Sequence, residues 1–367
     1  MWGGFAAYLG ALALAPRLDR RLVWATIAAL LVLFACLPPL LSHDVYSYVD
    51  YARLAIRHGL DPYVHAPQSA PGDPAFSHVT WTDTTSAYGP IFTLATYPLA
   101  WLPVDAAVYV LKAISAAAVL AIACLVAHLA PARGIDPIRA ATFVALNPLV
   151  LVHVVGGPHN DGLAVLLMTL GITGVLTARE TSAGAALAAA IAVKASTAIA
   201  APFALLGTLE RPTGLKPVYI SALSPTGRFL VGGIAAALLV GGVAWVGFGW
   251  DWLHAFALAG ENQGRTSHLS IPITTARLTG LDPDWVRATS LALYAALVIY
   301  LFLWTYRGGD WLRATAWATT GLLLATAWLL PWYLLWPLPA TALSRDRAVR
   351  LLLLGLTAYQ LGARIPL

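Results

Sequence analysis

Residues 22–59 read "LVWATIAALLVLFACLPPLLSHDVYSYVDYARLAIRHG" and join two different patterns. The first part, 22–41, is apolar and uncharged, and about 20 such residues are needed to cross the hydrocarbon core of a bilayer. The second part has helical spacing from Asp44 onward and stops at Gly59, a residue type that often ends helices. The stretch therefore predicts a membrane helix followed by a polar helix that begins with a carboxylate.

The same apolar character extends along the chain, which has 367 residues, of which 59% are hydrophobic and 11% charged. No polar stretch is long enough to fold separately, so we predict an all-α polytopic membrane protein in which 1–367 forms a single transmembrane domain. We expect roughly 10 to 12 membrane segments, including short or broken ones. The apolar segments cover approximately 2–15, 22–41, 90–102, 104–130, 138–155, 161–178, 182–208, 229–248, 287–305, 314–330, 332–343 and 349–363.

The basic residues predict the orientation of these segments. The chain has a net charge of +5. In a membrane protein such an excess of Arg and Lys marks cytoplasmic loops rather than nucleic-acid contacts, so no nucleic-acid partner is expected. No basic residue precedes the first apolar run, which argues against a cleaved signal peptide. Alternation then exposes polar loops near 42–90, 156–161 and 248–285 on the outer face, and eight of the nine histidines lie on or near that face. We therefore expect a plasma-membrane protein with its site on the extracytoplasmic side. The residues placed in the cytoplasm are Arg17, Arg20, Arg21, Arg133, Arg139, Arg179, Arg307, Arg313, Arg345, Arg347 and Arg350.

The segment 182–208 is an exception to this alternation. A single crossing would place Arg211, Lys216 and Arg228 outside, whereas a hairpin of two short helices broken around Lys194 returns them to the cytoplasm. Broken helices at membrane depth face protein or a water-filled cavity. The hairpin therefore implies a functional site, and a single straight crossing is the alternative.

Asp44 is the first candidate for chemistry. It either caps the helix that follows or, if Tyr48, Tyr51, Ala52 and Ala55 lie along the membrane surface, stands at the boundary of lipid and water. A carboxylate at that boundary can accept a proton from a hydroxyl that attacks a group presented from the lipid. Glycosyl transfer from a polyprenyl phosphate sugar has this geometry.

Such a reaction also needs positive charge for the departing phosphate. Lys194, Arg265 and His268 are the candidates; snorkelling of Lys194 and simple solvation of Arg265 are the alternatives. The turn "GGPHND" adds three consecutive polar groups that could bind sugar or phosphate, although one of the last two could cap the next helix. These groups are His159, Asn160 and Asp161.

The same outer loops also contain aromatic residues and possible metal ligands. His43, Tyr48, Trp81 and Tyr88 are candidates for contact with the acceptor or for stacking on a sugar, whereas Trp332, Tyr333 and Trp336 fit a belt at the membrane interface. A divalent metal could be held by His43, Asp44, His159 and Asp161, but their spacing does not require one. Cys36 and Cys124 each lie within an apolar run and suggest neither a disulfide nor a metal site. We expect no cofactor.

Five blocks in order resemble a known family. They are "SHDVYSYVDYARLAIRHGLDPYVHAP", "WTDTTSAYGPIF", "NPLVLVHVVGGPHNDGLAVLL", "AAIAVKASTAIAAPF" and "PWYLLWPLPA", spread from about residue 40 to residue 340. They look like the actinobacterial polyprenol-phosphate-mannose-dependent mannosyltransferases that elongate lipomannan-type glycans, which belong to the GT-C superfamily of membrane glycosyltransferases.

This resemblance implies a GT-C-type helix bundle and an inverting transferase with its active site on the outer face. The general base would be an Asp of the first outer loop, here Asp44. The donor would be a polyprenyl monophosphate sugar, most often mannose, and the acceptor a glycan or glycolipid, with membrane lipid around both. The chain is shorter than such enzymes, so terminal helices and a soluble C-terminal domain are expected to be missing.

A transporter or flippase of a polar or lipid-linked solute is the alternative function. The break around Lys194 would then be part of a translocation site. A transporter should show corresponding breaks in two repeated halves, and the sequence has no second break of this kind and no internal repeat. The clustering of polar groups on one face favours the enzyme.

Overall fold

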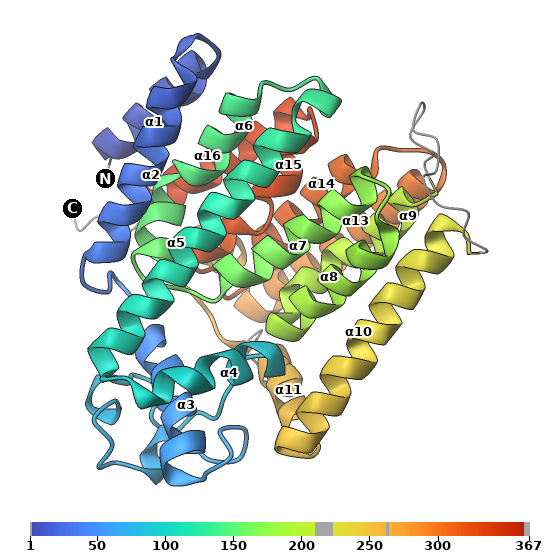
Figure 1. The fold of residues 1–367 in the computed structure, drawn as a ribbon. Coiled ribbons are helices and arrows are strands. Elements are labelled where there is room, and N and C mark those ends of the chain that lie inside the picture. The colour runs from blue at the N-terminus through green and yellow to red at the C-terminus, as the bar shows by residue number, and fades with distance from the viewer. Residues whose placement is uncertain (1, 210–222, 262–263, 363–367) are drawn as a thin grey trace.

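The computed structural model describes residues 2–209, 223–261 and 264–362. Within these ranges the chain is all-α and has no strand, as predicted (Figure 1). The α-helices are α1 (Trp2–Leu14), α2 (Arg20–Cys36), α3 (Asp44–His58), α4 (Pro90–Thr96), α5 (Val104–Leu129), α6 (Pro137–Ala145), α7 (Asp161–Leu176), α8 (Glu180–Val193), α9 (Ala201–Gly207), α10 (Pro225–Phe248), α11 (His254–Glu261), α12 (Ile271–Thr279), α13 (Pro283–Tyr306), α14 (Trp311–Ala325), α15 (Leu338–Leu343) and α16 (Arg347–Gly362).

Three of the described helices are long and apolar enough to cross a membrane: α5, α10 and α13. Their bounds agree with the predicted segments 104–130, 229–248 and 287–305 to within a few residues. Other apolar segments form shorter helices, α7 and α8 among them. The chain is therefore a membrane protein whose bundle combines spanning helices with short ones, while its organisation as one domain stays a prediction.

The apolar segment 138–155 is divided in the structure. Helix α6 ends at Ala145, and a π-helical turn follows at Val150–Val155. Pro148 has no N–H to continue a helix, and the side chain of Asn147 accepts a hydrogen bond from the Leu149 N–H instead. The π-helical turn leads directly into the turn that carries His159.

The break around Lys194 is present, and the chain reverses there. Helix α8 ends at Val193, Lys194 is extended, and a 3₁₀ turn (Ala195–Ala200) leads into α9. Arg228 near the start of α10 pairs with Glu180 at the start of α8 at 2.8 Å, so the chain has returned to the side from which it entered. The predicted hairpin is confirmed on this point, although Arg211 and Lys216 lie outside the described residues.

Helix α3 has the predicted bounds, and Gly59 ends it with φ of +66°, a conformation that suits glycine. The prediction that its Tyr48 face lies along the membrane surface is wrong. Tyr48 is 2% exposed and packs edge-on against Tyr88 and Phe92, at centroid distances of 4.7 and 4.9 Å. Edge-on aromatic contacts of this kind are favourable and bury the Tyr48 face inside the protein.

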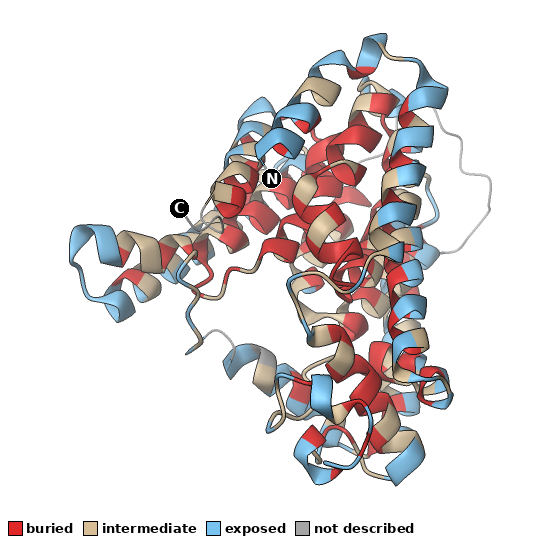
Figure 2. Cartoon of the chain, turned by 90° about the vertical axis from the view of Figure 1, so that its left-hand side faces the viewer, coloured by how far each residue is buried: buried red, intermediate tan, exposed pale blue. Residues whose placement is uncertain are grey.

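Small residues let α7, α8 and α10 approach closely. A Cβ atom on Gly184 would overlap the carbonyl oxygen of Phe229, and one on Gly232 would overlap that of Thr181. Close backbone approach at small residues is how membrane helices gain packing energy. Buried residues accordingly run through the middle of the bundle, while outer helices carry mostly exposed ones (Figure 2).

The two ends of the bundle differ. Helices α3, α4 and α11 gather at one end, opposite the turn between α5 and α6 (Figure 1). The long segment between α3 and α4 folds back on α3, where Tyr51 donates a hydrogen bond to the Thr84 carbonyl at 2.7 Å. The end with α3 carries the candidate functional site described below.

Candidate active site

A cavity of about 730 Å³ opens at the end of the bundle formed by α3 and α11. Segments far apart in sequence contribute to its wall. They are the start of α3, the loop before α4, the turn before α7, the break after α8 and the segment from the end of α14 to residue 336. Eight of the predicted site residues line it. They are Asp44, Tyr48, Trp81, Tyr88, His159, Asn160, Lys194 and Arg265.

Asp44 is the first residue of α3, and its carboxylate does not cap that helix. The Trp81 indole N–H donates to Oδ1 at 3.3 Å, and Nδ1 of His159 lies 3.6 Å from Oδ2. Burial raises the pKa of the Asp44 carboxyl above its usual value, while the Trp81 hydrogen bond and the charge of Lys194 oppose that shift. The raised pKa makes the Asp44 carboxylate a stronger base, and Asp44 lines the cavity.

His159 is fixed next to Asp44 by stacking on Trp332, with ring centroids 3.5 Å apart and planes inclined by 15°. Burial and the nearby Lys194 charge hold the pKa of His159 well below its usual range. The ring is therefore neutral at neutral pH and does not form a charged pair with Asp44.

Three buried polar atoms of cavity-lining residues have no hydrogen-bond partner within the described residues: Nε2 of His159, Nδ2 of Asn160 and Oγ of Ser196. Buried polar atoms in native proteins are nearly always paired. All three belong to residues that line the cavity, which indicates that the cavity takes a polar ligand. The sequence does not single out Ser196, although this polar residue stands two positions after Lys194 in an apolar run.

Lys194 points into the cavity from the break after α8. Its Nζ lies 2.7 Å from Oδ2 of Asp161 and 3.5 Å from Oδ1 of Asn160. It also lies 5.2 Å from the ring centroid of Tyr333 and 5.7 Å from that of Trp336, which are cation–π distances. Pairing inside the protein therefore replaces the snorkelling alternative for Lys194.

Asp161 holds this lysine in place. Its side chain is fully buried and also accepts a hydrogen bond from the Trp336 indole N–H at 2.5 Å. Neither Asn160 nor Asp161 caps α7 through its side chain, because Asn160 makes no capping bond and both Asp161 oxygens are engaged elsewhere. Asp161 thus supports the site without lining the cavity.

Arg265 supplies a second positive charge to the wall. Its guanidinium lies over the rings of Trp81, at 4.7 Å, and Trp328, at 6.0 Å. Trp81 therefore contacts the carboxylate through its N–H and the arginine through its ring face. The cavity brings together one base and two cations, with aromatic faces between them.

Two predicted residues are not brought to this site. The side chains of His43 and His268 are exposed and do not line the cavity. His43 packs edge-on against Tyr46, and the backbone carbonyl of His268 accepts from Thr274. Within the part of the chain that the structure describes, no three His, Cys, Asp or Glu side chains form a group that could hold a metal ion, and metal independence stays a prediction.

Comparison with known proteins places the chain in a family. Residues 1–210 match the family model described as alpha-(1->6)-mannopyranosyltransferase, N-terminal domain. The chain belongs to this family. The match covers α1 to α9 and so includes Asp44, Trp81, His159 and Lys194, whereas Arg265 lies beyond it.

Curated relatives carry the same name. Alpha-(1->6)-mannopyranosyltransferase A of Mycobacterium tuberculosis is 31% identical over 343 residues, and that of Corynebacterium glutamicum is 26% identical over 344. The alignments include 88% and 86% of this chain. The chain spans 65% and 69% of the relatives' own lengths, and no solved structure matches it.

Proposed function

We propose that this protein is an inverting glycosyltransferase that moves mannose from a polyprenyl monophosphate donor to a glycan or glycolipid acceptor on the extracytoplasmic face of the plasma membrane. The names of the relatives support the transfer of mannose. The observation that carries the proposal is the placement of the Asp44 carboxylate in the same cavity as Lys194 and Arg265.

In this reaction an acceptor hydroxyl attacks the anomeric carbon of the sugar, and the bond from that carbon to the phosphate oxygen breaks. Asp44 takes the proton of the hydroxyl as the new bond forms. Polyprenyl phosphate leaves with both electrons of the broken bond. Attack opposite the leaving group inverts the anomeric configuration.

The two cations would act on the leaving phosphate. Lys194 is a point charge fixed by Asp161, and Arg265 offers a planar guanidinium that matches two phosphate oxygens. Positive groups already in place where negative charge develops lower the barrier without reorganising. Asn160 and Ser196 would hold the sugar hydroxyls, since each has a buried polar atom without a partner within the described residues.

The donor class can be tested in membranes that contain the full chain. Radiolabelled mannose should pass to a mannoside acceptor from polyprenyl phosphate mannose, and not from GDP-mannose when synthesis of the lipid-linked donor is blocked. Direct transfer from GDP-mannose would overturn the proposed donor. Facilitated movement of the lipid-linked sugar across proteoliposomes without transfer to an acceptor would instead favour the transporter.

A further inference from the structure

A second cavity, of about 440 Å³, lies at the opposite end of α14 from the active site. Thr326, just after this helix, lines the first cavity, whereas Asp310, just before it, lines the second. Arg313, Arg345 and Arg347 also contribute to its wall. This is the end of the bundle that the distribution of basic residues assigns to the cytoplasm.

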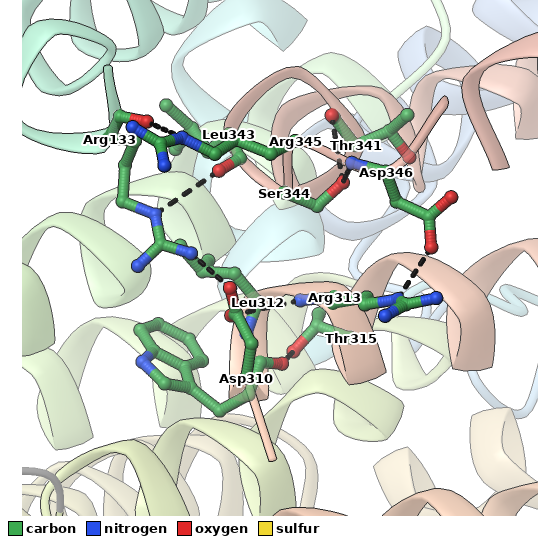
Figure 3. A network of polar contacts seen from close by, with 11 residues as sticks. Arg133, Asp310, Leu312, Arg313, Thr315, Thr341, Leu343, Ser344, Arg345 and Asp346 are labelled. Atoms are coloured by element: carbon green, nitrogen blue, oxygen red, sulfur yellow. Dashed lines mark hydrogen bonds and ion pairs between the residues drawn. The ribbon is translucent and has the colours of Figure 1, made fainter. Parts of the chain in front are cut away.

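A network of ion pairs gives this cavity a fixed frame, shown in Figure 3. Arg133 pairs with Asp310, and Arg313 Nε lies 2.6 Å from Oδ2 of Asp346. Arg345 donates to the backbone carbonyl of Arg133. The network ties the loops before α6, α14 and α16 to one another.

Arg345 is held in this frame at a backbone cost. Its φ is +56°, in the left-handed region that a residue with a side chain rarely adopts. Such strain persists where surrounding contacts impose it, and it gathers at binding sites. The hydrogen bond from the Arg345 side chain to the Arg133 carbonyl helps to hold Arg345 in this conformation.

Positive charge exceeds negative charge around the cavity. Both carboxylates are already engaged: Asp310 accepts from Arg133 and from the Leu312 N–H, and Asp346 from Arg313 and from the Ala348 N–H. Four arginines thus face two carboxylates, since Arg345 and Arg347 form no ion pair within the described residues.

The cavity also lies at the end of a membrane-spanning helix. Trp304 lines it and belongs to the last turns of the membrane helix α13, and the Arg313 guanidinium lies 5.6 Å from the centroid of its ring. The same end of α13 exposes Leu303 and Tyr306, at 46% and 68%. Tryptophan and tyrosine at the end of a span mark the interface between hydrocarbon and headgroups.

We propose that this cavity binds the phosphate headgroup of an anionic membrane lipid. Guanidinium groups recognise phosphate oxygens through paired hydrogen bonds, and basic pockets between membrane helices on the cytoplasmic side suit such headgroups. The acyl chains would lie along the exposed apolar surface of α13, which is why a lipid fits better than a free phosphate ion. The bound headgroup would brace the three loops that the network joins.

The test uses the purified full chain in detergent and measures binding of phosphatidylglycerol and phosphatidylcholine by native mass spectrometry. Arg347→Gln is the test variant, because its side chain forms no ion pair within the described residues. Arg307→Gln is the matched control, since Arg307 is exposed at the same end and does not line the cavity. Thermal unfolding without added lipid checks that both variants fold.

We expect phosphatidylglycerol to bind more tightly than phosphatidylcholine, and Arg347→Gln to weaken that binding about tenfold, as expected for the loss of one charged hydrogen-bond donor. Arg307→Gln should leave it within about twofold. Equal losses in both variants would show general attraction to a basic surface and overturn the site. Equal binding of the two lipids, or displacement of the lipid by equimolar inorganic phosphate, would overturn the lipid assignment.

Discussion

The ion pair between Lys194 and Asp161 allows the effect of Lys194 on stability to be separated from its effect on activity. In Lys194→Met, the fully buried Asp161 carboxylate keeps the Trp336 N–H but loses its cation, 2.7 Å away in the native protein. Breaking a buried ion pair by removing one partner costs about 3–5 kcal/mol. We therefore expect Lys194→Met to unfold several degrees below the wild type when heated in detergent.

The double variant Lys194→Met with Asp161→Asn removes both charges, so the unpaired buried charge disappears. Its unfolding temperature should recover most of the loss, because the neutral amide still accepts from Trp336. Its transfer rate should stay low, since Lys194 would stabilise the leaving phosphate by about 1.5–3 kcal/mol, a factor of about 10 to 150.

The assays are thermal unfolding of purified protein and mannose transfer in membranes at matched expression. Recovery of activity together with stability in the double variant would refute the role of Lys194 in the reaction. An unchanged unfolding temperature in Lys194→Met would refute the energetic argument itself.

Three further predictions concern the cavity wall. Trp81→Phe removes the hydrogen bond that lowers the pKa of Asp44, so the acidic limb of the rate–pH profile should move to higher pH, because the base is active only when deprotonated. Gly89→Ala places a Cβ atom against the backbone at the end of α8 and should cost about 1–3 kcal/mol of stability in thermal unfolding, whereas Gly72→Ala, with open space around it, should not. Arg265→Gln should slow mannose transfer about 10- to 150-fold while leaving the unfolding temperature unchanged. A normal rate would exclude Arg265 from the phosphate site.

The sequence was most informative where polar residues interrupt apolar runs. A lysine within an apolar segment costs free energy unless it is paired, so Lys194 predicts both the break after α8 and a residue of the candidate site. The bounds of α3, α5 and α13 followed from helix-ending residues and from the length of the apolar runs. These features depend on neighbours in sequence, which a single chain displays directly.

Partners far apart in sequence could not be predicted. The hydrogen bond between Trp336 and Asp161 joins residues 175 positions apart in sequence. The stacked rings of His159 and Trp332 are separated in sequence by a similar length of chain. The amphipathic face that contains Tyr48 shows that one side of the helix is covered, but it does not show whether protein or membrane covers it. The residue type of His268 and its place in an outer loop favour a role at the phosphate site. Neither feature determines where its side chain points.

The central claim is that Asp44 is the base of a mannosyl transfer, and it is tested most directly by transfer of radiolabelled mannose from polyprenyl phosphate mannose to a mannoside in membranes. Asp44→Asn should lower the rate by about 10²- to 10⁴-fold at matched expression. Asp83→Asn, in the exposed part of the same loop and outside the cavity lining, should keep the wild-type rate. A wild-type rate in Asp44→Asn would contradict the account.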